Sequence, residues 1–178
     1  MPSMNERDLY NPIKKYFENN IANNLGVKIK LIKTHDPIPR DIGFAHPEIR
    51  KVLKFYSYEP DLTGVIRPRA KQDKRWGKII IIKIKTGPLN LSDFYNLRVF
   101  SEVVESDFSF LISPSALPKR IEEKIKGKEK IYYKNYYLKT NGKVIIKEII
   151  VGKIIYETEP NKIKISNIEI DDDFHKLF

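Results

Sequence analysis

Apolar residues recur every four positions near the start of the chain: Leu9, Ile13, Phe17, Ile21 and Leu25. This spacing places them on one face of a helix, which we predict over residues 4–25. Pro12 lies inside the segment. Either it kinks a helix that Asn5 caps, or Asn11 caps a helix that begins at Pro12.

Strand patterns follow the first helix. Residues 27–34 alternate between apolar side chains and lysine, which predicts a half-buried strand near a sheet edge. Residues 77–85 contain four consecutive isoleucines, and β-branched residues without a polar face indicate a strand that is covered on both sides. Residues 58–66 predict a third strand, and Pro60 favours a strand end or a bulge there. Residues 108–113 predict a short buried strand.

Helices and loops separate these strands. Ser92 can cap a helix that runs to about residue 105 and presents a broad apolar surface. Residues 47–56 and 118–126 predict shorter helices, and prolines in residues 35–46 predict a loop. The resulting order is helix, strand, strand, strand, helix, strand. A strand that follows a helical crossover should lie parallel to an earlier one.

The last third of the chain has a different pattern. Four β-rich segments, divided by Asn-Gly, Gly and Pro-Asn, predict an antiparallel meander: residues 131–140, 143–151, 153–159 and 162–170. We therefore divide the chain into a core over residues 1–128, a β-meander extension over 129–170 that packs on or beside it, and an acidic tail over 171–178. The fold class is α/β (α+β) with a mixed central sheet.

Composition narrows the cellular context and the class of partner. The 178 residues include no cysteine, which excludes disulfides and thiolate zinc sites, and we expect a cytoplasmic protein. We also expect no membrane association, because no segment is long and apolar enough to cross a bilayer. Abundant lysine and isoleucine suit a thermophile. The net charge of +10 favours polyanions, and above all nucleic acid.

Charged residues gather at the ends of two predicted neighbouring strands. Lys83 and Lys85 close the isoleucine strand and share one face of it, and Glu59 and Asp61 share a face of the strand before it. Lysines at the end of a buried strand need anionic partners. Such an arrangement suits a phosphate- and metal-handling site, and it equally suits a structural ion pair.

The sequence Pro60-Asp61, followed by a hydrophobic strand that ends in Lys85, resembles the motif of the PD-(D/E)xK nucleases, the restriction-endonuclease-like superfamily. The element order above is similar to the core order of that fold. The resemblance implies that Asp61 binds a divalent metal and that Lys85 assists the attacking water. Lys83 stands where that family has its second acid.

The resemblance also implies an acidic metal ligand on the first helix. Glu6 is the first candidate because it borders the apolar stripe, and Glu18 is a weaker one; a solvated acid in the first helical turn is the alternative. Mg²⁺ or Mn²⁺ is the implied cofactor of an active enzyme, and an inactive protein needs none. Lys83 should repel such an ion and neutralise Asp61 directly. Glu59, Asp93 or Glu102 could restore a ligand set.

A strongly basic connection precedes the isoleucine strand. It is the candidate nucleic-acid-binding segment and holds Arg67, Arg69, Lys71, Lys74, Arg75, Trp76 and Lys78. The cations could contact phosphates while Trp76 stacks on a base or sugar. Alternatively, the connection is a solvated hairpin tip with Trp76 folded onto the core.

Three hypotheses for function follow. The favoured one is a nucleic-acid-binding protein with a nuclease-like fold and impaired or lost cleavage, as a homodimer or as a subunit of a DNA-processing complex. DNA is favoured over RNA. The second is an active metal-dependent nuclease that uses Asp61, Glu6 and Lys85. The third is a basic structural scaffold in which Asp61 pairs with Lys83.

Overall fold

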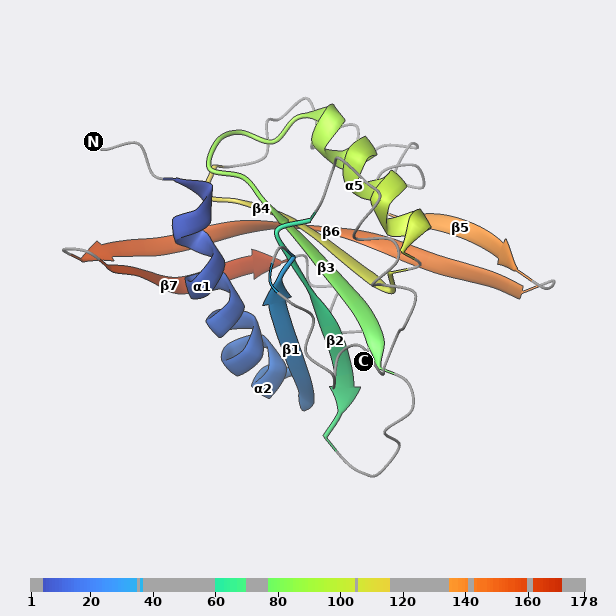
Figure 1. The fold of residues 1–178 in the computed structure, drawn as a ribbon, viewed down its shortest axis with the longest axis horizontal. Coiled ribbons are helices and arrows are strands. Elements are labelled where there is room, and N and C mark those ends of the chain that lie inside the picture. The colour runs from blue at the N-terminus through green and yellow to red at the C-terminus, as the bar shows by residue number, and fades with distance from the viewer. Residues whose placement is uncertain are drawn as a thin grey trace.

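A computed structural model describes residues 5–34, 36, 60–69, 77–104, 106–115, 135–140, 143–159 and 162–170, with the backbone alone in most of the last three ranges. The strands of these ranges form one mixed sheet in the order β1-β2-β3-β4-β6-β5, and β7 pairs with β6. Helices pack against the sheet, so the protein is a mixed α/β structure (Figure 1).

The first helical segment has three parts: α1 (Glu6–Tyr16), a π-helical turn (Phe17–Ile21) and α2 (Ala22–Asn24). Asn5 caps α1, and its side chain forms a capping box with Asp8. Pro12 lies inside α1, so of the two predicted alternatives the Asn5 cap is the one observed and the Asn11 cap is not. The Asn5 cap satisfies the backbone donors of the first turn and fixes the earlier start.

Two antiparallel pairings and one parallel pairing build the centre of the sheet. β1 (Val27–Lys33) pairs antiparallel with β2 (Leu62–Pro68), and β2 pairs antiparallel with β3 (Lys78–Ile84). β3 pairs in parallel with β4 (Phe108–Ser113) after the crossover helix α5 (Leu91–Val103). The predicted parallel pairing is therefore confirmed.

The two main helices cover opposite faces of the sheet. Ile80, Ile82 and Ile84 belong to one apolar cluster with Leu9 and Ile13 of α1. Residues of odd number in β3 and β4 point to the other face, where Ser109 of β4 bonds Ser101 of α5. Both faces of β3 are thus covered, as the isoleucine run predicted.

Asn90 caps α5, not Ser92, and its side chain accepts a hydrogen bond from the Asp93 backbone. Asp93 returns a bond to the Asn90 backbone, which completes a capping box. The helix begins two residues earlier than a Ser92 cap predicts, because this reciprocal pair satisfies two polar groups together.

The C-terminal strands join the same sheet. β5 (Asn135–Thr140) and β7 (Lys162–Ile170) each pair antiparallel with β6 (Lys143–Glu159). Residues 148–153 of β6 pair in parallel with β4. β6 runs unbroken through Gly152, where two predicted strands were divided, because Gly152 has partners on both sides in β4 and β7. In Figure 1, β6 extends past the central strands in both directions.

Candidate carboxylate–lysine site

Asp61 lies immediately before β2 and is fixed there by its backbone. Its N–H donates to the Ile82 carbonyl at 2.9 Å, and its carbonyl accepts from the Thr34 N–H at 3.0 Å. These two bonds extend the backbone hydrogen bonding of β2 with β3 and with β1 by one residue. Asp61 is therefore held between the end of β1 and the end of β3.

The Asp61 carboxylate is buried, with only 4% of the residue exposed, so it needs hydrogen-bond donors. Oδ1 accepts from the Tyr10 hydroxyl at 2.5 Å and lies 3.1 Å from the Lys83 ammonium. Oδ2 accepts from the Ile84 N–H at 2.6 Å. Both carboxylate oxygens therefore have partners.

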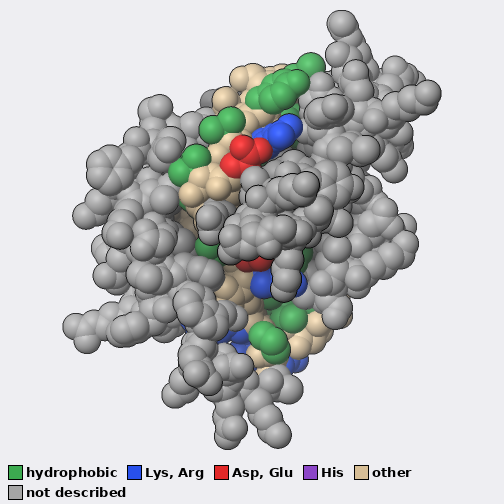
Figure 2. All heavy atoms as spheres, turned by 90° about the vertical axis from the view of Figure 1, so that its right-hand side faces the viewer, with side chains coloured by type: hydrophobic (Ala, Val, Ile, Leu, Met, Phe, Trp, Pro, Cys, Tyr) green, Lys and Arg blue, Asp and Glu red, His purple; other side chains and the backbone are tan. Residues whose placement is uncertain are grey.

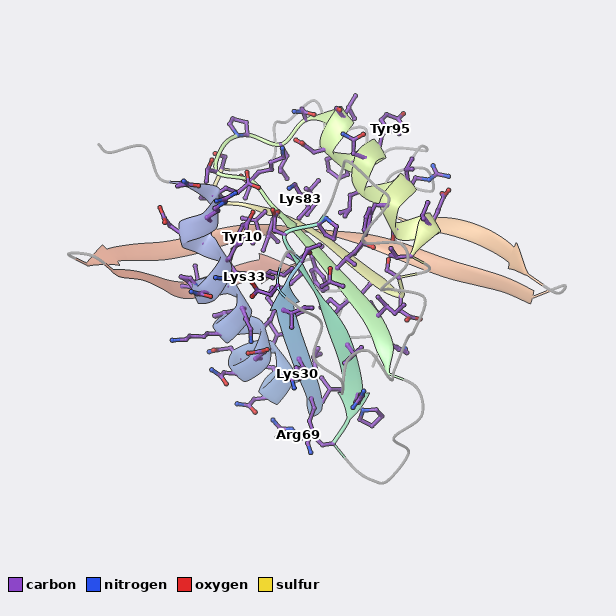
Figure 3. The ribbon with its side chains drawn as sticks, viewed as in Figure 1. Tyr10, Lys30, Lys33, Arg69, Lys83 and Tyr95 are labelled. Carbon is purple, nitrogen blue, oxygen red and sulfur yellow. The ribbon has the colours of Figure 1, made fainter. Side chains whose placement is uncertain are left out.

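The Lys83 ammonium lies between two carboxylates. It is 3.1 Å from Asp61 Oδ1 and 3.4 Å from Glu6 Oε1. Its side chain is 13% exposed and that of Glu6 is 30% exposed. Figure 3 shows Tyr10 of α1 and Lys83 of β3 close to each other, and both contact Asp61 Oδ1. The structure thus brings together Glu6, Asp61 and Lys83, as the sequence predicted, and adds Tyr10.

The electrostatics of this group follow from burial and repulsion. Burial raises the pKa of Glu6, and the nearby negative charge of Asp61 raises it further, although Lys83 acts in the opposite direction. Burial and the hydrogen bond to Asp61 raise the pKa of the Tyr10 phenol well above its usual range. Tyr10 is therefore a permanent donor to Asp61 at neutral pH.

Lys85 does not join this group. Its ammonium lies 3.0 Å from Asp93 Oδ1, in the first turn of α5. Asp93 is buried and its other oxygen accepts from the Asn90 N–H. The lysine of the motif therefore pairs with the crossover helix, whereas Lys83 pairs with Asp61. Lys85 lies one residue beyond the end of β3, where Asp93 in the first turn of α5 offers a buried carboxylate.

The other described candidates have structural partners. Glu18 pairs with Lys14 and accepts from the Leu31 N–H, and Glu102 pairs with Arg98. Figure 2 shows acidic and basic side chains lying next to one another on the face it presents. Neither acid supplies a third carboxylate to Asp61.

Three residues of the basic connection are described. Arg69 donates to the Val27 carbonyl and to the Asn23 side chain. Lys78 lies 5.2 Å from the Phe108 ring centroid, and Arg67 is half-buried in β2. The remaining candidates lie outside the described residues: Glu59, Lys71, Lys74, Arg75 and Trp76. Their predicted contacts with nucleic acid stay predictions.

The residues at the site do not fit a divalent metal. Mg²⁺ requires several oxygen ligands in near-octahedral geometry, whereas Glu6 and Asp61 offer two carboxylates whose shared space holds the Lys83 ammonium. No group of three or more histidine, cysteine, aspartate or glutamate side chains suited to a metal exists in the described part of the chain. An ammonium beside two carboxylates supplies the positive charge that an ion would otherwise bring.

The role of the Tyr10 hydroxyl had no signal in the sequence. Tyr10 widens the apolar stripe of α1, which explains the burial of its ring. The direction of its hydroxyl depends on how α1 is rotated against the sheet, and periodicity does not fix that rotation.

No family model matches the chain, and no curated protein and no solved structure matches it either. Among the helices that the structure describes, none has the length and apolar character needed to cross a lipid bilayer.

Proposed function

We propose that this protein binds nucleic acid, with DNA favoured over RNA, on a fold related to the PD-(D/E)xK nucleases whose metal-dependent cleavage is lost. The observation that carries the proposal is the Lys83 ammonium between Glu6 and Asp61, 3.4 Å and 3.1 Å from their oxygens. The order of α1, β1, β2, β3, α5 and β4 supports the relationship in fold. The net charge of +10 supports a polyanionic partner.

The chemistry explains why binding is favoured over cleavage. Metal-assisted phosphodiester hydrolysis uses an ion to stabilise the attacking and leaving oxygens. At this site Lys83 neutralises the carboxylates that would hold the ion, and Asp93 holds the lysine that would assist the water. The retained positive charge still attracts a phosphate backbone.

Two measurements test the proposal together. We expect the wild-type protein to bind duplex DNA with an affinity that falls steeply as salt rises, because bound phosphates release counterions. We expect no cleavage of DNA or RNA in Mg²⁺ or Mn²⁺. Binding without any salt dependence, or no binding at low ionic strength, would contradict the binding function.

A substitution at Lys83 tests the reason for the lost cleavage. Lys83→Glu places a third carboxylate beside Glu6 and Asp61, so we expect Mn²⁺ to bind this variant in calorimetry and not the wild type. Lys15→Glu is the matched control, because Lys15 is an exposed residue of α1 and the charge change is the same. Cleavage by the wild type that disappears in Asp61→Ala and in Lys85→Ala would instead establish the active nuclease.

A further inference from the structure

A cavity of about 330 Å³ opens beside the carboxylate–lysine site. Its described lining consists of Arg7, Tyr10, Lys33 and Asp36. Figure 3 shows Tyr10 on α1 and Lys33 at the end of β1 next to each other. The volume is near the lower end of the range of about 300–1,000 Å³ that is typical of ligand sites.

Hydrogen bonds to Asp61 also fix the position of the cavity lining. The Tyr10 hydroxyl donates to Asp61 Oδ1, so the ring that lines the cavity has a fixed position. The backbone of Thr34, next to Lys33, donates to the Asp61 carbonyl. The Asp36 N–H donates to the Lys33 carbonyl at 2.9 Å and closes the turn after β1. Arg7 follows Glu6 in the first turn of α1. The cavity is therefore part of the same framework as the site.

The cavity lining holds two cations that come from two different elements. Lys14, Lys83, Lys85 and Arg98 each pair with a carboxylate. Within the described ranges, the side chains of Arg7 and Lys33 have no carboxylate partner. Asp36 contributes one negative charge, so the described lining carries a net positive charge.

We propose that this cavity binds a phosphate group, and the proposal rests on the nucleic-acid-binding function above. A guanidinium presents paired donors to phosphate oxygens, and a lysine ammonium adds a point charge. Arg7 and Lys33 come from two elements and meet at one cavity, an arrangement suited to an anion with several oxygens. The volume admits a phosphate with part of its sugar. The phosphate is either internal to the nucleic-acid backbone or at a strand end.

The test compares two double variants with equal loss of charge. Arg7→Gln/Lys33→Gln removes both cations of the cavity. Lys15→Gln/Lys28→Gln removes two exposed lysines from the same two elements, α1 and β1, outside the described lining. Binding of a fluorescent duplex is measured over a salt series. We expect the cavity variant to lose at least about tenfold more affinity than the control, and its salt slope to fall by about 2.

Inorganic phosphate, added at constant ionic strength, identifies the ligand class. It should compete with the duplex for the wild type and for the control variant, and not for the cavity variant. Asp36→Asn removes the negative charge from the lining, so we expect it to tighten duplex binding. Single-stranded oligonucleotides with and without a 5′-phosphate separate the two sources: a preference for the phosphorylated form assigns the cavity to strand ends, and equal affinity assigns it to the backbone.

The failures of the two proposals are distinguishable. If the wild type binds duplex DNA and both double variants lose the same affinity, the cavity proposal is overturned and the binding function stands. If the wild type binds no nucleic acid, both are overturned. Circular dichroism confirms that each variant is folded, and weaker binding by a folded Asp36→Asn variant would also contradict a phosphate site.

Discussion

At the scale of single residues, the group around Asp61 is a buried ion pair with a fixed set of donors. The Tyr10 hydroxyl, the Lys83 ammonium and the Ile84 N–H come from α1 and from β3. Breaking one partnership in such a group leaves a buried charge without full compensation. The contacts of this group therefore stabilise the junction of α1 with the sheet.

Tyr10→Phe tests this contribution. The substitution keeps the buried ring and removes one donor from a buried carboxylate, which costs about 1–3 kcal/mol. We expect the free energy of unfolding in urea to fall by that amount. Tyr95→Phe is the control, because Tyr95 is 49% exposed and water can replace any bond that its hydroxyl loses. Equal effects of the two substitutions would show that the bond to Asp61 contributes nothing measurable.

Glu6 gives a dependence of stability on pH. Its pKa in the folded protein is raised above the ordinary value of 4.5, so the folded state binds this proton more tightly than the unfolded state does. As pH rises from the pKa of Glu6 in the unfolded state to its higher pKa in the folded state, Glu6 should lower the free energy of unfolding. Above the folded-state pKa this decrease in the free energy of unfolding stays constant.

The measurement compares the wild type with Glu6→Gln, which cannot titrate, by denaturant unfolding from pH 4 to pH 8. The wild type minus variant difference should decrease with rising pH and then level off. A difference that increases with pH would mean that Lys83 outweighs burial and the repulsion from Asp61.

At the scale of elements, the pairing of β1 with β2 depends on one glycine. Gly64 is opposite Leu31, and a Cβ at Gly64 would lie 1.9 Å from the Lys30 carbonyl oxygen and 2.9 Å from Leu31 Cα. Both of these atoms belong to the backbone of β1, so they cannot move aside as the end of a flexible side chain can. The close approach of these strands therefore requires glycine at this position.

Gly64→Ala should lower the free energy of unfolding by about 3 kcal/mol or more, because β1 must move away from β2. Gly87→Ala is the control, since nothing lies within 4 Å of a Cβ at Gly87, and it should change stability by less than about 0.5 kcal/mol. Thermal and urea unfolding of the two variants provide the measurement. A Gly64→Ala protein as stable as the control would show that the close approach of β1 and β2 does not require glycine.

Elements with a clear period were predictable from the sequence. The bounds of β4 match the prediction, β1 is one residue shorter at its end, and β3 is one residue shorter at each end. Runs of apolar or alternating residues leave one register that buries them. The α5 cap was misplaced because Asn90 and Ser92 are both good caps, although Asp93 stands three residues after Asn90 as a capping box requires. β6 was divided at Gly152 because its partners on both sides are distant in sequence.

The site was predictable only in part. Strand alternation and chain order predicted that Asp61 and Lys83 lie together, and helix periodicity predicted that Glu6 lies at the edge of the buried face. The bonds of Tyr10 and Lys85 depend on how α1 and α5 are rotated against the sheet, and no local pattern specifies these rotations. The family relationship, the domain division and the cytoplasmic location stay predictions.

At the scale of the whole molecule, the net charge acts over longer distances than the individual ion pairs do. The excess of ten positive charges attracts polyanions over about one Debye length, roughly 8 Å at physiological salt. The described ion pairs are local and hold helices to strands. A partner guided by the long-range field would then be oriented by cations that are not already paired, such as Arg7 and Lys33.

The parallel contact between β4 and β6 has a consequence for biosynthesis. All six residues of β4 are buried, and one of its two hydrogen-bonding edges is completed by residues 148–153. Until the ribosome has released those residues, the nascent chain carries an apolar strand with an open edge, the type of surface on which chains aggregate. Premature termination before residue 148 should therefore yield insoluble fragments, and chaperones that cover open strands should associate with the chain during this interval.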